Sequence, residues 1–402
     1  MAKLKMIKKM IQSIRDIWLI VGISVFLFAL LEGACSFTFL VMDHVTASNT
    51  RMFDSRAQAD DYRKIPWSED YFKEFNESSA LRWEPYVYWR RKPYNSKYIK
   101  VNTDGFRVTP NSEISSENAQ PSLRLFMFGG STMWGTGARD ALTIPALLAT
   151  ELRSRGIKVE VVNFGETGYV STQEVITLLL QLQKGNIPNL VVFYDGGNDT
   201  YSAYQQGIAG LPQNEYNRAK EFNLTKRLPE IKRIVVKDTI NNLATVRFTK
   251  ALLRRIGMRK TEQKDEPDYD KGRIVEEAVN LYLNNLELVK SLAVSYKFKY
   301  IFYWQPTIFG KNKLSDYEKA EYAREQHLEK FFKETHNILR EKTTHPRYEK
   351  TFYDLSAIFS HVEEPVYIDW IHLSERGNAT IAQAMVEQIL YLIPSANGGL
   401  PD

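Results

Sequence analysis

The chain has 402 residues, of which 44% are hydrophobic and 25% are charged, with a net charge of +5 and one cysteine. This composition excludes a disordered or fibrous protein, and the length suits one large domain or two small ones around a sizeable core. A single cysteine excludes an intramolecular disulfide framework and a thiolate metal cluster. Stability must therefore come from the burial of apolar surface.

The positive charge is concentrated in two segments. Residues 1–16 carry five basic residues and one acidic residue, and residues 226–260 carry eleven basic and two acidic residues. These segments hold net charges of +4 and +9, which leaves −8 for the rest of the chain. A nucleic-acid-binding protein carries its positive charge on the domain that contacts the phosphates, so nucleic acid is not expected as a partner.

Residues 17–42 are predicted to form a transmembrane helix. The run has 26 residues and one charged side chain, Glu32, and about 20 apolar residues are enough to cross the hydrocarbon core. Basic residues precede the run and Asp43 follows it, so the positive-inside rule predicts a cytoplasmic tail at 1–16 and an extracytoplasmic location for the remainder. Glu32 is costly in lipid and is expected to have a partner or to be protonated.

A cleaved signal peptide is the alternative interpretation of this run, because Trp18–Leu31 has the length of a signal sequence's apolar region. Phe37–Met42 stays apolar beyond any plausible cleavage site, which favours an uncleaved anchor. Lipid attachment at Cys35 is disfavoured, since a lipoprotein motif has an apolar residue three positions earlier and this chain has Glu32 there.

Residues 43–121 are polar and aromatic and show neither a helical nor a strand period. We interpret them as a stalk that packs onto the following domain. The segment Val101–Arg107 indicates a turn leading to an aromatic anchor, and the polar residues 111–122 after it indicate a loop.

Residues 122–398 alternate short apolar runs with longer helical patterns, which is typical of a parallel sheet with helices on both faces. A mostly helical, basic insertion at 201–271 interrupts this alternation. Right-handed crossovers place the loops after the strands at one edge of the sheet, where ligands bind in open α/β folds. We expect strands at 123–128, 159–164, 190–194, 300–304 and 351–355, and helices at 144–155, 172–183, 274–296, 316–340 and 375–392.

Within the insertion, residues 226–260 combine their basic charge with interspersed apolar residues. This combination favours contact with anionic lipid headgroups or with a polyanionic polymer, and the segment could partly cover the site. A solvated helical hairpin stabilised by its own packing is the alternative.

Ser131 is the candidate nucleophile. It follows the predicted strand 123–128 and the glycines Gly129 and Gly130, which allow a tight turn, and it would open a helical region whose free N–H groups favour an anion. Taken alone, Gly-Gly-Ser after a strand is more often an ordinary strand-to-helix cap. A phosphate-binding loop is excluded, because the spacing Gly-x-x-x-x-Gly-Lys is absent.

Gly168 and Asn198 are candidate donors to an oxyanion. They follow the second and third predicted strands, and they could supply a backbone N–H and a side-chain amide to a carbonyl oxygen that becomes negative during acyl transfer. Each residue separately is also a common turn former.

His372 is the candidate base among six histidines. It has an apolar lead-in and Asp369 three positions earlier, close enough on a bent loop for the carboxylate to hold one ring nitrogen while the other faces Ser131. By contrast, His327 and His336 lie on a charged helical pattern that suits a solvated face. No further His, Asp or Glu cluster adjoins the pair, so we expect no metal centre.

Four short motifs, in the order in which they occur along the chain, resemble those of the SGNH hydrolase family, also called GDSL esterases and lipases. Ser131 matches the serine of the first motif, in a Gly-Gly-Ser-Thr variant of Gly-Asp-Ser-Leu, and Gly168, rather than Gly165, matches the glycine of the second. Asn198 matches the Gly-x-Asn-Asp motif, and the Asp-x-x-His motif is the fourth. The motifs are Gly129–Thr132, Asn163–Gly168, Gly196–Asp199 and Asp369–His372, and the resemblance covers about residues 123–392.

The resemblance implies a three-layer α/β/α fold with a short parallel, flavodoxin-like sheet and no metal or organic cofactor. It further implies that Ser131 attacks an ester, that His372 moves the proton and that Asp369 orients the imidazole. The N–H groups of Ser131 and Gly168 and the Asn198 amide would form the oxyanion hole.

Membrane-anchored relatives of this kind often act on acyl groups of cell-surface carbohydrates. We therefore expect a membrane-tethered, extracytoplasmic serine ester hydrolase whose substrate is an ester-bearing small molecule or a surface glycan. An O-acyltransferase with the same site, or a catalytically silent glycan-binding protein, are the alternatives. A minimal family member lacks the basic insertion, so the substrate of such a relative cannot be assigned to this chain.

Overall fold

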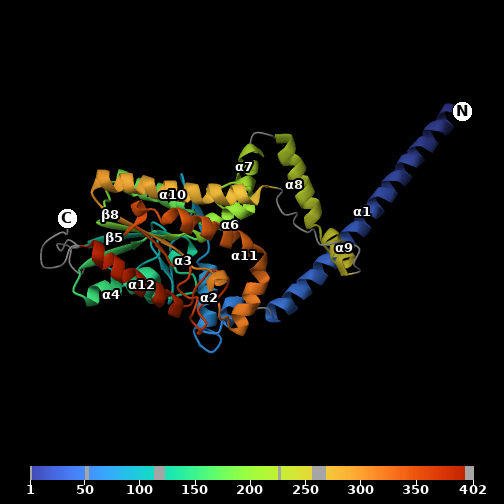
Figure 1. Cartoon of the computed structure of the whole chain (residues 1–402). Coiled ribbons are helices and arrows are strands. Elements are labelled where there is room, and N and C mark those ends of the chain that lie inside the picture. The colour runs from blue at the N-terminus through green and yellow to red at the C-terminus, as the bar shows by residue number, and fades with distance from the viewer. Residues whose placement is uncertain (1, 50–53, 113–122, 225–227, 256–268, 394–402) are drawn as a thin grey trace. The chain divides into compact units, whose positions relative to one another are not determined.

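The computed structural model describes residues 2–49, 54–112, 123–224, 228–255 and 269–393 (Figure 1). They belong to two compact units, each described by itself. The N-terminal unit comprises Met1–Met52 and Asn217–Glu266, and the sheet unit comprises Phe53–Tyr216 and Pro267–Asp402.

The sheet unit is built on five parallel strands in the order β6-β5-β7-β8-β9. In chain order this is 2-1-3-4-5, the flavodoxin-like arrangement, which places a crevice beyond the carboxyl ends of β5 and β7. The predicted α/β fold is thereby confirmed. The strands are β5 (Leu123–Gly129), β6 (Val159–Asn163), β7 (Leu190–Asp195), β8 (Lys299–Trp304) and β9 (Phe352–Asp354).

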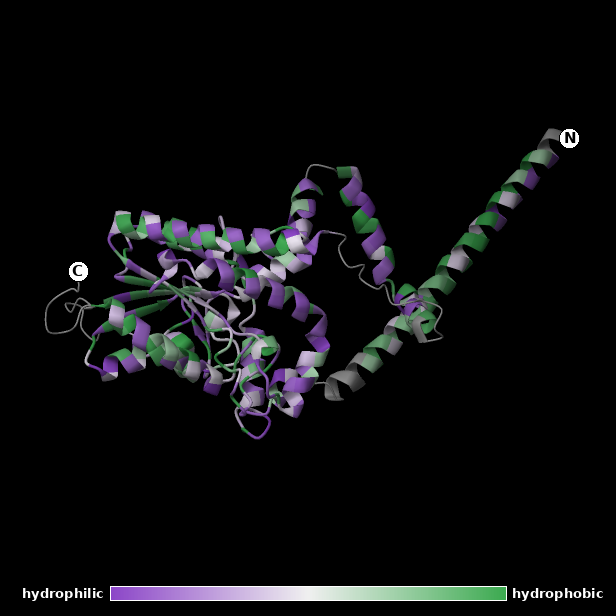
Figure 2. Cartoon of the chain, viewed as in Figure 1, coloured by the Kyte–Doolittle hydropathy of each residue, from purple (hydrophilic) through white to green (hydrophobic). Residues whose placement is uncertain are grey.

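Helices cover both faces of this sheet (Figure 1). Side chains alternate along each strand. Leu125 therefore packs on one face with α4 (Ile144–Ser154) and α12 (Glu375–Leu392), while Phe126 packs on the other with α5 (Ser171–Gln183) and α10 (Lys271–Tyr296). Figure 2 shows the strands as mainly hydrophobic, as expected where both faces are buried. The helices of this unit are α2 (Ser68–Glu77), α3 (Ser131–Trp134), α4 (Ile144–Ser154), α5 (Ser171–Gln183), α6 (Gly197–Gln206), α10 (Lys271–Tyr296), α11 (Asp316–Thr343) and α12 (Glu375–Leu392).

Residues 54–112 pack into the same unit as the sheet. Tyr71 and Phe72 of α2 belong to a buried cluster that also contains Trp134 of α3 and Ile368. The segment adds two small antiparallel hairpins, whose strands are too short to show a period in the sequence. They are β1 (Leu81–Glu84) with β2 (Tyr88–Arg91), and β3 (Tyr94–Asn95) with β4 (Lys100–Val101).

The N-terminal unit contains α1 (Ala2–Asn49), α8 (Leu228–Asn242) and α9 (Ala244–Arg255), and α7 (Glu215–Leu224) begins at its boundary. In α1, Lys5–Met42 is long and apolar enough to cross a membrane. The helix is longer than the predicted span 17–42, because polar residues at both ends continue the helical backbone. The predicted insertion 201–271 is divided, since residues 201–216 and 269–271 belong to the sheet unit.

Candidate active site

Ser131 is the first residue of α3, directly after β5. The two positions before it must be glycine, because neighbouring atoms leave no room for a side chain. A Cβ at Gly129 would lie 2.3 Å from the carbonyl oxygen of Tyr194, and one at Gly130 would lie 2.2 Å from the amide nitrogen of Asn198. The turn therefore presents the serine at the carboxyl edge of the sheet with its backbone close to the Asn198 side chain.

His372 and Asp369 lie on the loop between β9 and α12 and form a chain of hydrogen bonds with Ser131. His372 Nε2 is 2.7 Å from Ser131 Oγ, and His372 Nδ1 is 2.6 Å from Asp369 Oδ2. The other carboxylate oxygen, Oδ1, accepts from the backbone N–H groups of Ile371 and His372 at 3.0 and 2.7 Å. The spacing Asp-x-x-His thus closes a turn that fixes both side chains.

The charge on Asp369 is held by its surroundings. Burial by itself raises the pKa of this carboxyl. The charge and hydrogen bond of His372 and the charge of Arg56 lower the pKa by more than burial raises it, so the pKa lies well below its ordinary value. Arg56 Nη1 is 4.0 Å from Asp369 Oδ2. Asp369 is therefore an anion at any working pH, suited to hold a protonated imidazole.

Gly168 is available as a donor, whereas Gly165 is not. The N–H of Gly165 donates to Asn163 Oδ1 at 2.9 Å, and a Cβ there would lie 2.5 Å from the backbone nitrogen of Trp134. Gly168 has φ +77°, which favours glycine, and the nearest atom to its Cβ position is 3.4 Å away. Within the described chain its N–H has no hydrogen-bond partner.

The amide of Asn198, in the first turn of α6, is held from both sides. Its nitrogen donates to the carbonyl oxygen of Tyr169 at 2.8 Å, and its oxygen accepts from Gln213 at 3.3 Å. One amide hydrogen therefore remains for a ligand above Gly130. Since Tyr169 follows Gly168, these contacts also bring the Gly168 loop to the same edge.

Asp199 joins α6, which carries Asn198, to the start of α5, which follows the Gly168 loop. Its carboxylate accepts from Ser171 Oγ at 2.5 Å and from the Ser171 N–H at 3.1 Å, at the N-terminus of α5. This contact is buried and fixes α6 against α5, so it positions Asn198 without facing the site itself.

Glu166 supports the Gly168 loop and was not predicted from the sequence. It is fully buried, and its carboxylate accepts from the backbone N–H groups of Thr167 at 2.8 Å and of Arg91 at 3.0 Å. An acidic residue in a loop motif is normally read as solvated, so only its partners from residues 54–112 reveal this role.

Two buried arginines clamp α3, the helix that carries Ser131. The guanidinium carbons of Arg91 and Arg107 lie 3.9 and 4.3 Å from the centre of the Trp134 indole. Arg107 also donates to the carbonyl oxygens of Gly135 and Ala138, each at 2.6 Å. These contacts satisfy carbonyl groups at the end of α3 and just beyond it, and they hold the turn that carries Ser131 in place.

The predicted residues thus meet at one edge of the sheet: Ser131, His372 and Asp369 in one hydrogen-bonded chain, with Gly168 and Asn198 beside it. Such an arrangement can deprotonate a hydroxyl and receive a negative oxygen. In the described part of the chain, no group of three or more His, Cys, Asp or Glu residues could hold a metal ion.

Comparison with known proteins gives one family and several remote structures. The family model described as GDSL-like lipase/acylhydrolase matches residues 125–385. No curated protein matches the sequence. Among solved structures, the chain is similar to an acetyl xylan esterase with 14% identity and a TM-score of 0.38, covering 66% of this chain and 100% of the other. An α/β hydrolase from the metagenome of Lake Arreo, Spain, has 15% identity and a TM-score of 0.37, covering 69% and 99%. An acetylxylan esterase from Geobacillus stearothermophilus has 16% identity and a TM-score of 0.33, covering 67% and 94%.

Proposed function

Since the chain belongs to the GDSL-like lipase/acylhydrolase family and is an ester-bond hydrolase, we propose that Ser131, His372 and Asp369 carry out its reaction through an acyl-enzyme. The observation that carries the proposal is the pair of short contacts of His372, 2.7 Å to the serine hydroxyl and 2.6 Å to the carboxylate. A serine is a useful nucleophile only when a base takes its proton and a third group orients the base.

In the first half-reaction, Ser131 Oγ attacks the ester carbonyl while His372 Nε2 takes the hydroxyl proton. The C–O bond to the alcohol then breaks, and the protonated imidazole returns the proton to the leaving alcohol. In the second half-reaction, His372 takes a proton from water, the hydroxide attacks the acyl carbon and Ser131 leaves with the proton. Asp369 stabilises the imidazolium in both halves because its carboxylate holds Nδ1.

The negative oxygen of each tetrahedral intermediate is received by three donors in this proposal. They are the N–H of Ser131 at the start of α3, the unpaired N–H of Gly168 and the remaining amide hydrogen of Asn198. Donors that are already in place act only on the charge that develops, and each contributes on the order of 100- to 1000-fold in rate.

We place the enzyme at the cell membrane, with α1 as a single-pass anchor, residues 1–16 in the cytoplasm and the sheet unit outside. The support is the apolar span within Lys5–Met42 and the basic residues that precede it. We propose that the chain consists of a cytoplasmic tail, a membrane span, a stalk that packs onto the next domain, and a catalytic domain. Their bounds are 1–16, 17–42, 43–121 and 122–398.

The alcohol part of the substrate is proposed to be a surface carbohydrate. Trp89 of β2 donates from its indole nitrogen to the carbonyl oxygen of Thr167 at 2.9 Å, so hairpin β1–β2 borders the Gly168 loop. On the same hairpin, Trp83 is 66% and Tyr86 is 74% exposed. Exposed aromatic rings on a hairpin that borders the Gly168 loop suit the apolar faces of sugar rings, and such residues mark binding surfaces.

The test uses a fluorophosphonate probe and p-nitrophenyl acetate turnover on the full chain. Wild type and the control Ser154→Ala, an exposed serine on α4, are expected to be labelled and active. Ser131→Ala is expected to lose both properties. Unlabelled wild type, or labelling that persists in Ser131→Ala, contradicts the proposal, and acyl transfer to an added glycan in preference to water identifies an O-acyltransferase.

A further inference from the structure

One face of the apolar helix α1 is covered within the N-terminal unit. Among the α1 side chains that the structure describes, residues 5–42, all are exposed except Glu32, Cys35 and Phe39. These residues are three and four positions apart, which places them on one face of a helix. The covered face therefore includes the single charged residue of the predicted span.

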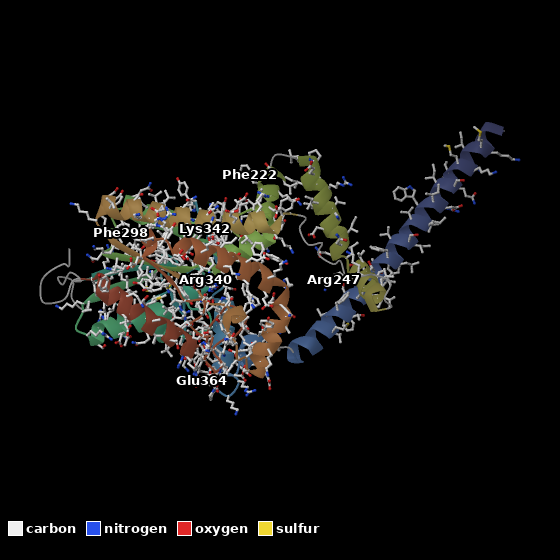
Figure 3. All side chains as sticks on the ribbon, viewed as in Figure 1. Phe222, Arg247, Phe298, Arg340, Lys342 and Glu364 are labelled. Atoms are coloured by element: carbon white, nitrogen blue, oxygen red, sulfur yellow. The ribbon has the colours of Figure 1, made fainter. Side chains whose placement is uncertain are left out.

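The element that covers this face is α9. Glu32 accepts hydrogen bonds from the backbone N–H of Ala244 and, at 3.0 Å, from that of Thr245, which also donates its hydroxyl at 2.8 Å. Ala244 and Thr245 are the first residues of α9, where N–H groups have no partner within the helix. The guanidinium carbon of Arg247 lies 4.5 Å from the ring centre of Phe39, and Figure 3 labels Arg247 where α9 meets α1.

The contact lies in the half of the span that is remote from the N-terminus. The apolar run 17–42 has 26 residues and is about 39 Å long at about 1.5 Å per residue, against a hydrocarbon core of about 30 Å. Glu32 and Phe39 are 15 and 22 residues from its start. With the N-terminus in the cytoplasm, α9 meets α1 in the outer leaflet.

This arrangement explains how a carboxylate is tolerated in an apolar span. Both oxygens of Glu32 accept hydrogen bonds from α9, and the positive end of a helix dipole favours the negative charge. A carboxylate in lipid without such partners is costly. Glu32 therefore acts as the attachment point of a second helix.

Helices α8 and α9 carry a surface that suits a lipid leaflet. Lys250 of α9 donates to Asn241 of α8 at 2.7 Å, which ties the two helices together. Aliphatic and basic side chains are interspersed along the exposed surface of α8, and α9 adds an exposed phenylalanine and leucine. They are Lys232, Arg233, Ile234, Val235, Val236, Lys237 and Ile240 on α8, and Phe248 and Leu252 on α9.

We propose that α9 docks on the outer half of α1 through Glu32, and that α8 and α9 thereby form a second membrane element whose partner is the anionic phospholipid of the outer leaflet. The inference rests on the proposed membrane-spanning role of α1. Lysine and arginine attract anionic headgroups, while the aliphatic side chains enter the boundary with the acyl chains. Because α9 is held against α1, the basic and aliphatic side chains of both helices lie close to this boundary.

The test measures the membrane depth of single cysteines in the full chain, reconstituted in nanodiscs with anionic lipid. In a Cys35→Ser background, an environment-sensitive fluorophore is placed at Phe28→Cys on α1, at Phe248→Cys on α9 or at the control Val294→Cys, an exposed position on α10. Quenching by spin-labelled lipids is expected at the first two positions and at background level at the control.

Glu32→Leu then separates docking from anchoring. It is expected to reduce quenching at position 248 to the control level and to leave quenching at position 28 unchanged. Background quenching at 248 with strong quenching at 28, or quenching at 248 that Glu32→Leu does not change, overturns the docking of α9. No quenching at position 28 instead overturns the anchor on which the docking depends.

The lipid partner is tested with the same fluorophore at Val235→Cys on α8. Quenching there is expected to require anionic lipid and to fall in about 0.5 M salt, because salt screens the attraction of exposed charges. Equal quenching in purely zwitterionic nanodiscs, or quenching insensitive to salt, overturns the assignment of anionic phospholipid as the partner.

Discussion

Arg56 is predicted to set the pH at which the enzyme loses activity in acid. Its Nε and Nη2 atoms donate to Asp54 at 2.9 and 2.7 Å, and its Nη1 is 4.0 Å from Asp369 Oδ2. The rings of Phe72 and Phe75 lie 5.3 and 4.7 Å from the guanidinium carbon. Arg56→Met keeps much of this packing and removes the positive charge.

The size of the effect follows from the distances. The separation of Arg56 Nη1 and His372 Nδ1 is at most about 6.6 Å, since it cannot exceed the 4.0 Å and 2.6 Å steps through Asp369 Oδ2 taken together. At that separation a guanidinium and a protonated imidazole repel by about 0.6 kcal/mol at a dielectric constant of about 80 and by about 2.5 kcal/mol at about 20. One pH unit corresponds to about 1.36 kcal/mol, so the acid limb of activity should move to higher pH by about half a unit to two units.

The assay is kcat/KM for p-nitrophenyl acetate between about pH 5 and about pH 9, where the acid limb reports the free enzyme's base. Arg56→Lys is the matched control, because it keeps the charge and should shift the limb less. Tyr317 and Glu321 of α11 also interact with Asp369, and neither variant alters them. An unchanged or lowered midpoint in a folded Arg56→Met variant refutes the reasoning.

Four further results are expected. Asn198→Ala should lower kcat by about 100- to 1000-fold with KM little changed, because the lost amide donor acts on the transition state, as steady-state kinetics would show; an unchanged kcat removes Asn198 from the oxyanion hole. Trp83→Ala should raise KM for an acetylated oligosaccharide and leave p-nitrophenyl acetate turnover unchanged, and equal effects on both substrates argue against a sugar surface. Burial and the charge of Asp199 raise the pKa of Asp195 to about 8, so the folded state binds more protons than the unfolded state between about pH 4 and about pH 8 and stability falls as pH rises through this window. Asp195→Asn should therefore raise the thermal midpoint more at about pH 9 than at about pH 5, and a pH-independent change would contradict the assignment. Lys311→Met removes the ammonium that lies 2.7 Å from the buried carboxylate of Glu318. This change should lower the free energy of unfolding by about 3–5 kcal/mol in urea titrations. A loss below about 1 kcal/mol would show that the Lys311–Glu318 pair is not desolvated.

The parallel sheet could be predicted from the sequence because its strands are covered on both faces. Every residue of β7 is buried, so the strand reads as a continuous apolar run that starts at Leu190, the predicted residue. The site motifs were also accessible, since each depends on local chemistry. Gly129 and Gly130 directly follow an apolar run, where a tight turn is expected, and Asp369 reaches His372 across three positions of one loop.

The supporting residues could not be predicted, because their roles depend on partners far away in the chain. Arg91 and Arg107 look like ordinary surface charges in the sequence, but both are buried against the Trp134 indole. In the same way, Glu32 was expected to need a partner, but the N-terminus of α9 lies more than 200 positions further on. Periodicity and spacing describe neighbours in sequence, and these contacts are between neighbours in space.

The covalent state of Ser131 during turnover is the most direct test of the proposed acyl-enzyme. Full-length enzyme is mixed with an acetylated oligosaccharide or a p-nitrophenyl ester, stopped in acid within a few turnovers and mapped by peptide mass spectrometry. One acyl group is expected on Ser131, accumulating in wild type and absent from Ser131→Ala. Turnover with an unmodified Ser131, or an acyl group on another residue, would contradict it.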